Sequence, residues 1–213
     1  MNLQRLGLSA GLAFLVLIAR PALSADDDGF KPLFTGKDLS GWVTPDDKAI
    51  FNVVDGAIVG KESQPGQLKK NEFLVTDRDY SDFVLKAKVQ ILGGNSGIQF
   101  RSKREANGRV VGPQVDIADG YWGVLYDEGG KRGIIERYPP EKAAALVKEG
   151  GWNDLVVTLK GDHLTVSLNG TTILDRNDPL FPKSGVIALQ CHAGQKRMEV
   201  KFKDLEIKAE DAH

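Results

Sequence analysis

Apolar and polar residues alternate along much of the chain, which is the period of a β-strand with one buried face. The clearest case is residues 83–90, where Phe83 and every second residue after it are apolar. The same alternation runs through residues 155–159 and 164–168, on either side of a Gly161-Asp162 turn. Asn169-Gly170 then begins a third strand, because both positions of an Asn-Gly turn tolerate a positive φ. This part of the chain therefore predicts a three-stranded meander.

Shorter apolar runs between turn residues predict more strands, and only one segment favours a helix. Residues 140–148 begin with Pro140 in the first turn, contain three consecutive alanines and end before Gly150. The remaining strands are expected at residues 51–54, 57–60, 72–76, 97–101, 114–117, 124–126, 171–174, 186–191 and 198–207. Many short strands and 24 glycines predict an all-β protein, a jelly-roll β-sandwich with one short helix; a closed barrel is the alternative.

The first 25 residues follow a different pattern and are predicted to be a signal peptide. Arg5 precedes an almost unbroken apolar run over residues 6–19, and Ala22-Leu23-Ser24 favours cleavage after Ser24 or Ala25. The alternative is a retained membrane anchor, although the run is shorter than the about 20 residues that span a bilayer. We therefore expect a periplasmic or secreted protein with a signal peptide at residues 1–25, one domain at residues 26–210 and no membrane contact after cleavage.

Composition and charge narrow the class of partner. Signal cleavage would remove Arg5 and Arg20 from the 28 basic residues and nothing from the 29 acidic ones, leaving 26 against 29 and a net charge of −3. A near-neutral balance without a basic arm argues against nucleic-acid binding, which depends on phosphate neutralisation. Cys191 is the only cysteine, which excludes an intramolecular disulfide and a cysteine-rich zinc module. Phosphate-loop, HExxH and GxSxG motifs are also absent from the sequence.

Unusual polar residues occur on three of the predicted strands, on the face opposite to the apolar side chains. The pairs are Gln99 and Arg101, Gln114 and Asp116, and Gln190 and His192. If these strands are neighbours in one sheet, their outer face is a groove that can hydrogen-bond sugar hydroxyls and supply an acid or a base. The alternatives are structural: a satisfied histidine at a strand end, and an Arg101–Asp116 salt bridge.

Six short motifs follow one another along the chain: FTGKDLSGW at 34–42, DYSDF at 79–83, GNSGIQFR at 94–101, GWN at 151–153, LNG at 168–170 and GVIALQCH at 185–192. In this order they resemble the 3-keto-disaccharide hydrolase family (DUF1080), also described as a 3-keto-glucoside 1,2-lyase / 3-keto-2-hydroxy-glucal hydratase domain. The resemblance spans residues 30–207. It implies a concanavalin-A-like jelly roll, secreted or periplasmic, that acts on a small oxidised glycoside supplied by a glucoside 3-dehydrogenase.

The resemblance implies that a glycosidic bond is cleaved by elimination. A ketone at sugar carbon 3 acidifies the hydrogen on carbon 2, so a modest base can remove it. The resulting enolate expels the aglycone from carbon 1, and water then adds to the product, which gives hydrolysis overall. This route needs a base, a stabiliser for the enolate oxygen and help for the leaving group. It does not need the paired carboxylates of an ordinary glycosidase.

Site roles follow from the same resemblance. Arg101 would hold the keto or enolate oxygen, and His192 would act as base or acid. Asp116 would be a second base or would orient a partner. The expected sugar contacts are Asn95, Gln99, Gln114, Trp122, Tyr126 and Gln190. Many relatives carry Glu-x-Gln where this chain reads Gln114-Val115-Asp116, so the carboxylate lies two places further along the same strand face. The resemblance implies no definite cofactor. If the carboxylate is a metal ligand rather than a base, a divalent ion such as calcium or manganese would replace arginine as the stabiliser of the enolate.

Two other classes of protein remain open at this stage. One is a carbohydrate-binding module without catalysis, in which Tyr121 and Trp122 form an aromatic platform for a sugar ring. The other is an interaction domain of an export or surface assembly.

Overall fold

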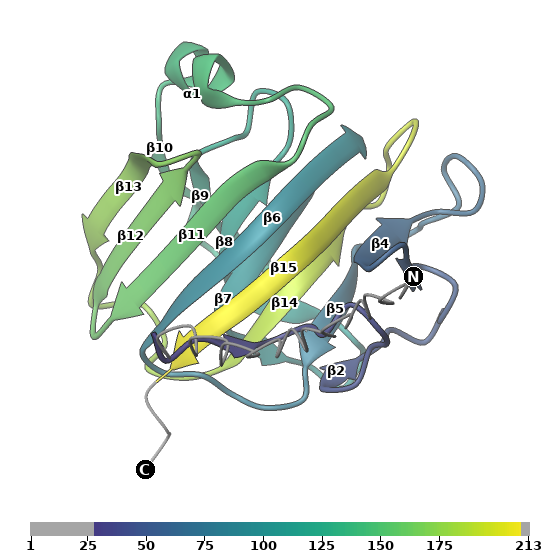
Figure 1. Cartoon of the computed structure of the whole chain (residues 1–213), viewed down its shortest axis with the longest axis horizontal. Coiled ribbons are helices and arrows are strands. Elements are labelled where there is room, and N and C mark those ends of the chain that lie inside the picture. The colour runs from purple at the N-terminus through teal and green to yellow at the C-terminus, as the bar shows by residue number, and fades with distance from the viewer. Residues whose placement is uncertain (1–27, 210–213) are drawn as a thin grey trace, which may run out of the picture.

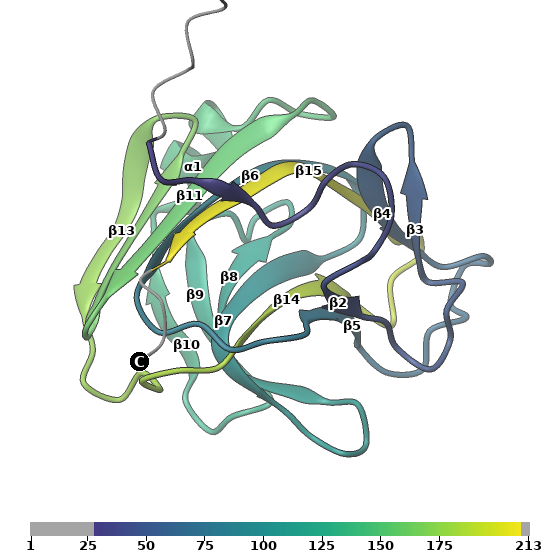
Figure 2. The ribbon, with the colours of Figure 1, turned by 60° about the horizontal axis from the view of Figure 1, so that its bottom comes forward.

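A computed structural model describes residues 28–209, so the predicted signal peptide and its cleavage site lie outside the described residues. Two antiparallel β-sheets pack face to face, as Figures 1 and 2 show. The predicted all-β sandwich with one short helix is confirmed, and the closed barrel is not formed. Within the described residues, no helix has the length and apolar character needed to cross a membrane.

The first sheet has strand order β13-β12-β11-β6-β15-β4-β3, with β1 paired to β15. Its strands are β1 (Lys31–Pro32), β3 (Phe51–Val54), β4 (Ala57–Lys61), β6 (Phe83–Gly93), β11 (Asn153–Lys160), β12 (His163–Leu168), β13 (Thr171–Asn177) and β15 (Glu199–Ala209). The predicted meander is confirmed, because β11, β12 and β13 pair antiparallel in that order. The alternation in β6 is also confirmed: Phe83 and Leu85 are buried, while Val84 and Lys86 are half-buried.

The second sheet has strand order β10-β9-β8-β7-β14-β5-β2. Its strands are β2 (Trp42–Val43), β5 (Glu72–Thr76), β7 (Ser96–Arg104), β8 (Val110–Ile117), β9 (Val124–Glu128), β10 (Gly133–Arg137) and β14 (Val186–Cys191). The three strands that carry the polar pairs, β8, β7 and β14, are neighbours, as the groove hypothesis requires. Three strands are not predicted by the sequence pattern: β1 and β2, which have two residues each, and β10, where Ile134-Ile135 breaks the alternation.

Helix α1 (Pro140–Leu146) is two residues shorter than predicted, because Val147 is already extended. Between the sheets, Phe100 and Phe181 pack edge to face with ring centroids 5.7 Å apart. Cys191 also faces this core, as expected from its position in β14. Burial raises the pKa of its thiol to about 12, which keeps it protonated and unreactive near neutral pH.

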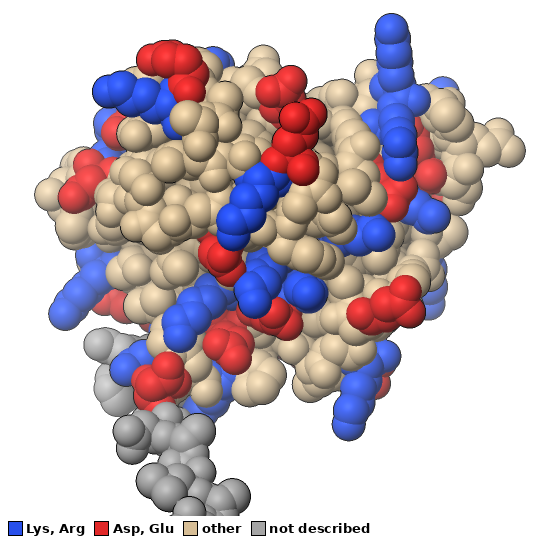
Figure 3. All heavy atoms as spheres, turned by 45° about the horizontal axis from the view of Figure 1, so that its top comes forward, with Lys and Arg blue, Asp and Glu red and all other residues tan. Residues whose placement is uncertain are grey.

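The outer face of the first sheet carries charged side chains of both signs. Lys88 lies 3.1 Å from Asp204, and Lys201 lies 3.8 Å from Glu199. Figure 3 shows basic and acidic side chains interspersed over the face in view. An exposed ion pair such as Lys88–Asp204 contributes only about 0–1 kcal/mol, so it marks a solvated surface. The polar pairs singled out in the sequence lie on the second sheet.

Candidate functional site

A cavity of about 570 Å³ is lined by β8, β9 and the segment after β14. We refer to it as the groove. Five of the predicted site residues line it: Asn95, Gln114, Asp116, Tyr126 and His192. Gln114 and Asp116 share one face of β8, and Tyr126 stands opposite Gln114 on β9. The structure thus brings the predicted carboxylate and the predicted histidine into one cavity.

Asp116 is a buried carboxyl group in the groove, with only 5% of the residue exposed. Removal from water raises its pKa from 3.8 to about 7. A hydrogen bond of 2.8 Å from Gln114 Nε2 to Asp116 Oδ1 favours the charged form and lowers the pKa, whereas the charge of Glu128 raises it. A carboxyl group with a pKa near 7 can both accept and release a proton at neutral pH, which suits a general base.

Two further glutamines lie behind Gln114. Its Nε2 also donates to Gln190 Oε1 at 3.2 Å, and Gln99, paired with Gln114 in the β7–β8 ladder, donates to the carbonyl of Val110 at 3.2 Å. Gln99 and Gln190 are fully buried and do not line the groove. The prediction that they contact a sugar there is therefore wrong. Of this glutamine layer (Gln99, Gln114 and Gln190), Gln114 alone lines the groove.

Gly97 makes room for the side chain of Gln114. It is paired with Asp116 in the β7–β8 ladder, and a Cβ at position 97 would overlap the Gln114 amide. Gly97→Ala is therefore expected to move Gln114 away from Asp116, at a cost of about 1–3 kcal/mol in stability. Loss of a hydrogen bond that favours the ionised carboxylate should raise the pKa of Asp116. A carboxyl-carbon NMR titration measures this shift directly.

The control for that substitution is Gly151→Ala, whose added methyl group would meet no atom closer than 3.3 Å. The control should leave the titration of Asp116 unchanged. If Gly97→Ala also left it unchanged, Gln114 would have no part in setting the pKa of Asp116.

His192 directly follows β14 and is fixed by its backbone neighbours. Its N–H donates to the carbonyl of Asn95 at 3.3 Å, and the next N–H, that of Ala193, donates to Asn71 Oδ1 at 3.0 Å. The imidazole Nδ1 lies 2.6 Å from the carbonyl oxygen of Ala193. Because a carbonyl can only accept, we assign the hydrogen to Nδ1, which leaves Nε2 for a ligand or a proton.

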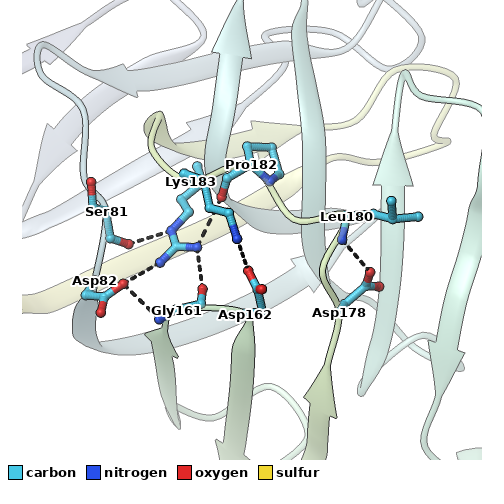
Figure 4. A network of polar contacts seen from close by, with 9 residues as sticks. Ser81, Asp82, Gly161, Asp162, Asp178, Leu180, Pro182 and Lys183 are labelled. Atoms are coloured by element: carbon cyan, nitrogen blue, oxygen red, sulfur yellow. Dashed lines mark hydrogen bonds and ion pairs between the residues drawn. The ribbon is translucent and has the colours of Figure 1, made fainter.

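Arg101 does not line the groove. It adopts a positive φ of 45° in β7, where the β7–β8 and β7–β14 ladders both shift register, and this irregularity ends the strict alternation of faces. Its side chain is 1% exposed. The guanidinium donates to four partners (Figure 4): the carbonyls of Ser81, Gly161 and Pro182 and the carboxylate of Asp82. The predictions that Arg101 pairs with Asp116 and holds an enolate oxygen beside it are therefore wrong.

The aromatic platform is only half present. Trp122 is 5% exposed and lines a neighbouring cavity, so the prediction that it contacts a sugar in the groove is wrong. Its ring packs into the core, where burial of a large aromatic surface is favourable. Tyr121 is 43% exposed and lines the groove, with the guanidinium carbon of Arg137 5.3 Å from its ring centroid. Tyr121 thus offers an aromatic face to a ligand.

The groove also contains residues that sequence reasoning missed: Asn71, Asp119, Glu128 and Gln195. The strand pattern could have identified Glu128, because this residue shares a strand face with Tyr126 on β9. It was missed because the predicted strand ended two residues too early. Asn71 had no comparable signal. It joins the site through the tertiary fold, with Asn71 Nδ2 donating to Glu128 Oε1 at 3.0 Å.

The residues of the groove do not fit the divalent-ion alternative. In the part of the chain that the structure describes, no three His, Cys, Asp or Glu side chains lie close enough to hold a metal ion together. The polar neighbour of Asp116 Oδ1 is the amide nitrogen of Gln114, which donates a hydrogen bond and cannot be a metal ligand in that orientation. No step proposed below passes through a metal.

Solved β-sandwich proteins share the fold of this chain. Two candidate glycosyl hydrolases of Parabacteroides distasonis share the fold. The first is 23% identical with a TM-score of 0.60, and the match covers 86% of this chain and 94% of the other chain. The second is 20% identical with a TM-score of 0.62, and the match covers 85% of this chain and 99% of the other chain. The carbohydrate-binding module CBM66 of Bacillus subtilis shares it with 17% identity and a TM-score of 0.56, over 79% of this chain and 96% of the module.

The family is defined more closely by the sequence. Residues 29–208 match the 3-keto-alpha-glucoside-1,2-lyase-like domain, and the chain belongs to this family. A comparison with curated proteins gives no match. The resemblance noted in the six motifs is therefore confirmed, and it supports a carbohydrate-related, glycosidase-like function.

Proposed function

We propose that the protein cleaves the glycosidic bond of 3-keto-glucosides by elimination across carbons 1 and 2, followed by hydration. The observation that carries this proposal is the buried carboxyl group of Asp116, with a pKa of about 7, in one cavity with His192. Removal of an activated hydrogen next to a ketone needs one well-placed base of this strength. A displacement mechanism would instead use two carboxyl groups flanking the glycosidic bond. Since Asp119 and Glu128 also line the groove, deuterium incorporation at carbon 2 is the measurement that separates the two routes.

Each groove residue receives a role in this scheme. Asp116 takes the proton from carbon 2, and the electron pair left behind forms the enolate of the 3-ketone. Collapse of the enolate breaks the bond from carbon 1 to the aglycone oxygen, which receives a proton from the imidazolium form of His192. Water then adds across the new double bond, with its oxygen on carbon 1 and a proton returned to carbon 2.

With Arg101 outside the groove, the enolate oxygen needs other donors. The amides of Asn95 and Gln195 line the cavity and are the candidates for this role. Neutral donors fixed before the reaction stabilise a developing negative charge most strongly where water is excluded. Tyr126 remains a candidate for hydrogen bonding to a sugar hydroxyl.

The experiment that tests the function incubates the chain, without residues 1–25, with a 3-keto-glucoside in deuterated water. Release of the aglycone with deuterium appearing at carbon 2 supports elimination and hydration. Release without deuterium at carbon 2 points to direct hydrolysis. Absence of release from several 3-keto-glucosides, together with binding of the unoxidised glucoside, would favour the binding-module alternative.

His192→Ala is expected to lower turnover by about 10²- to 10⁴-fold for a 3-keto-glucoside with an alkyl aglycone, whose oxygen needs protonation to leave. The loss should be much smaller for a 4-nitrophenyl aglycone, which leaves as a stable anion. Steady-state kinetics with both substrates measures this difference. His163→Ala, on the exposed histidine of β12, is the control and should behave as wild type. Equal losses for both aglycones would show that His192 does not protonate the leaving group.

A sugar-binding module without catalysis is the second candidate, supported by the exposed ring of Tyr121 at the groove. Such a ring can stack on the face of a sugar. In that case Tyr121→Ala would abolish binding of a glucoside, and no substrate would be consumed.

The proposed substrate also sets the protein's metabolic surroundings. A 3-keto-glucoside forms when the carbon 3 hydroxyl of a glucoside is oxidised, so an enzyme of the glucoside 3-dehydrogenase class must supply it. We place this chemistry in the periplasm or outside the cell, in accordance with the predicted signal peptide.

A further inference from the structure

A second cavity of about 610 Å³ adjoins the groove, and Gly94 and Asp119 line both. It is formed where α1 covers the end of β6 and the loop before β9. Figure 1 shows α1 at this end of the sandwich. A ligand bound in the groove can therefore continue into this cavity, which has the size of a typical small-molecule site.

Four apolar side chains line the inner part of the second cavity. Trp122 and Ala143 are its buried apolar residues, and Ile91 and Val147 are half-buried members. These side chains come from three different elements, and each also packs against the main core. A lining anchored in this way is fixed before a ligand arrives, which lowers the entropic cost of binding.

The polar and charged side chains of this cavity are either already paired or at its rim. Asn153 is its one buried polar side chain within the described residues. Its Oδ1 accepts from the N–H of Lys148 at 2.8 Å, and its Nδ2 donates to the carbonyl of Lys148 at 3.1 Å. The charged members Asp119, Lys148 and Glu149 are all exposed. The buried side chains of this cavity therefore offer few free partners for hydroxyl groups, and burying a hydroxyl without a partner is costly.

We propose that this second cavity binds the aglycone of the substrate and that the aglycone is an apolar ring, such as a phenol, rather than a second sugar. The inference rests on the proposed function for the sugar half. If carbon 1 lies between the groove residues Asp116 and His192, the departing group must extend out of the groove, and the shared wall at Gly94 leads to an apolar space. Contact of a ring with this lining then contributes to selection among substrates.

The helix provides a matched pair of test variants. Ala144 and Ala145 are both exposed residues of α1, but only Ala144 lines the second cavity. Ala144→Phe should fill the cavity and lower kcat/KM for 4-nitrophenyl 3-keto-glucoside by at least about tenfold. Methyl 3-keto-glucoside, whose aglycone is too small to reach the cavity, should be cleaved as by wild type. Ala145→Phe should change neither value.

The outcomes separate this inference from the proposed function. If wild type cleaves both substrates and Ala144→Phe affects both equally or neither, the aglycone assignment is wrong and the proposed function stands. If wild type cleaves neither, the proposed function fails. Calorimetry with the unoxidised glucosides then tests whether the second cavity binds an apolar ring. A preference for 4-nitrophenyl glucoside over methyl glucoside, lost in Ala144→Phe and kept in Ala145→Phe, would support an apolar-ring site. Equal binding of the two glucosides by wild type would overturn it.

Discussion

Asp116→Asn is expected to lower turnover of 3-keto-glucosides by about 10³-fold or more, because the amide has no basic oxygen for the carbon 2 proton. The substitution preserves the shape of the side chain, and its oxygen can still accept from Gln114 Nε2, so the sandwich should fold unchanged. Turnover and deuterium incorporation at carbon 2 are the measurements. Both should fall together, since both depend on the same proton transfer.

Asp119→Asn is the matched control, because Asp119 lines the same groove but is exposed. It should keep most of the wild-type turnover. If Asp116→Asn were as active as this control, the base would have to be sought elsewhere in the groove, with Glu128 and His192 as the remaining candidates.

The pH dependence of wild-type turnover should follow the same carboxyl group. Only the ionised form accepts a proton. For a 4-nitrophenyl aglycone, which leaves without a proton from His192, kcat/KM should therefore rise with pH and level off above the pKa of about 7. Stability should change in the opposite direction. The folded chain binds this proton more tightly than the unfolded chain. The contribution of the protonated Asp116 to the free energy of unfolding is therefore complete below about pH 4 and is lost as the pH rises through 7.

Asp116→Asn removes this ionisation and should therefore be more stable than wild type at pH 8. The gain has an upper bound of about 4 kcal/mol, the free energy that corresponds to a pKa raised from 3.8 to about 7. Urea unfolding at pH 5 and pH 8 measures it. A variant that is inactive and more stable at high pH would show that the fold carries a buried charge at a cost in stability, as expected of a functional group.

Alternation of apolar and polar residues was enough to predict most of the fold. It located β6, β11 and β12 because each has one face in the core and one toward solvent. It also placed Gln114 and Asp116 on one face of β8, and this pair lies in the groove. Alternation fixes the face of a residue only while the strand stays regular.

The site residues that were placed wrongly show where this rule fails. The two-residue period of a regular β-strand places Arg101 on the same face as Gln99. The positive φ at Arg101 and the shifted register of β7 change the direction of its side chain. Gln99 and Gln190 were on the correct strands, yet burial by neighbouring elements is a tertiary property that a strand pattern does not contain. Trp122 lies in a loop, where no periodicity applies.

Arg101→Met is expected to destabilise the folded protein by about 3–5 kcal/mol, although Arg101 lies outside the groove. Methionine fills similar volume but donates no hydrogen bond. The substitution would leave three carbonyl groups and Asp82 without the donor that now joins β7 to the loops around Ser81, Gly161 and Pro182. For a domain of this size, such a loss lowers the unfolding temperature by roughly 10 °C or more.

The contrast with the groove makes this prediction decisive for the role of Arg101. At a temperature where Arg101→Met is still folded, its kcat should equal that of wild type, because the guanidinium touches no residue that lines the groove. Arg104→Met, an exposed position three residues further along β7, should change neither the unfolding temperature nor kcat. A variant that kept wild-type stability but lost kcat would return Arg101 to the chemistry and contradict the arrangement in Figure 4. The expected result, lower stability with unchanged kcat, would show that a buried arginine in a family motif serves the sandwich while Asp116 serves the reaction.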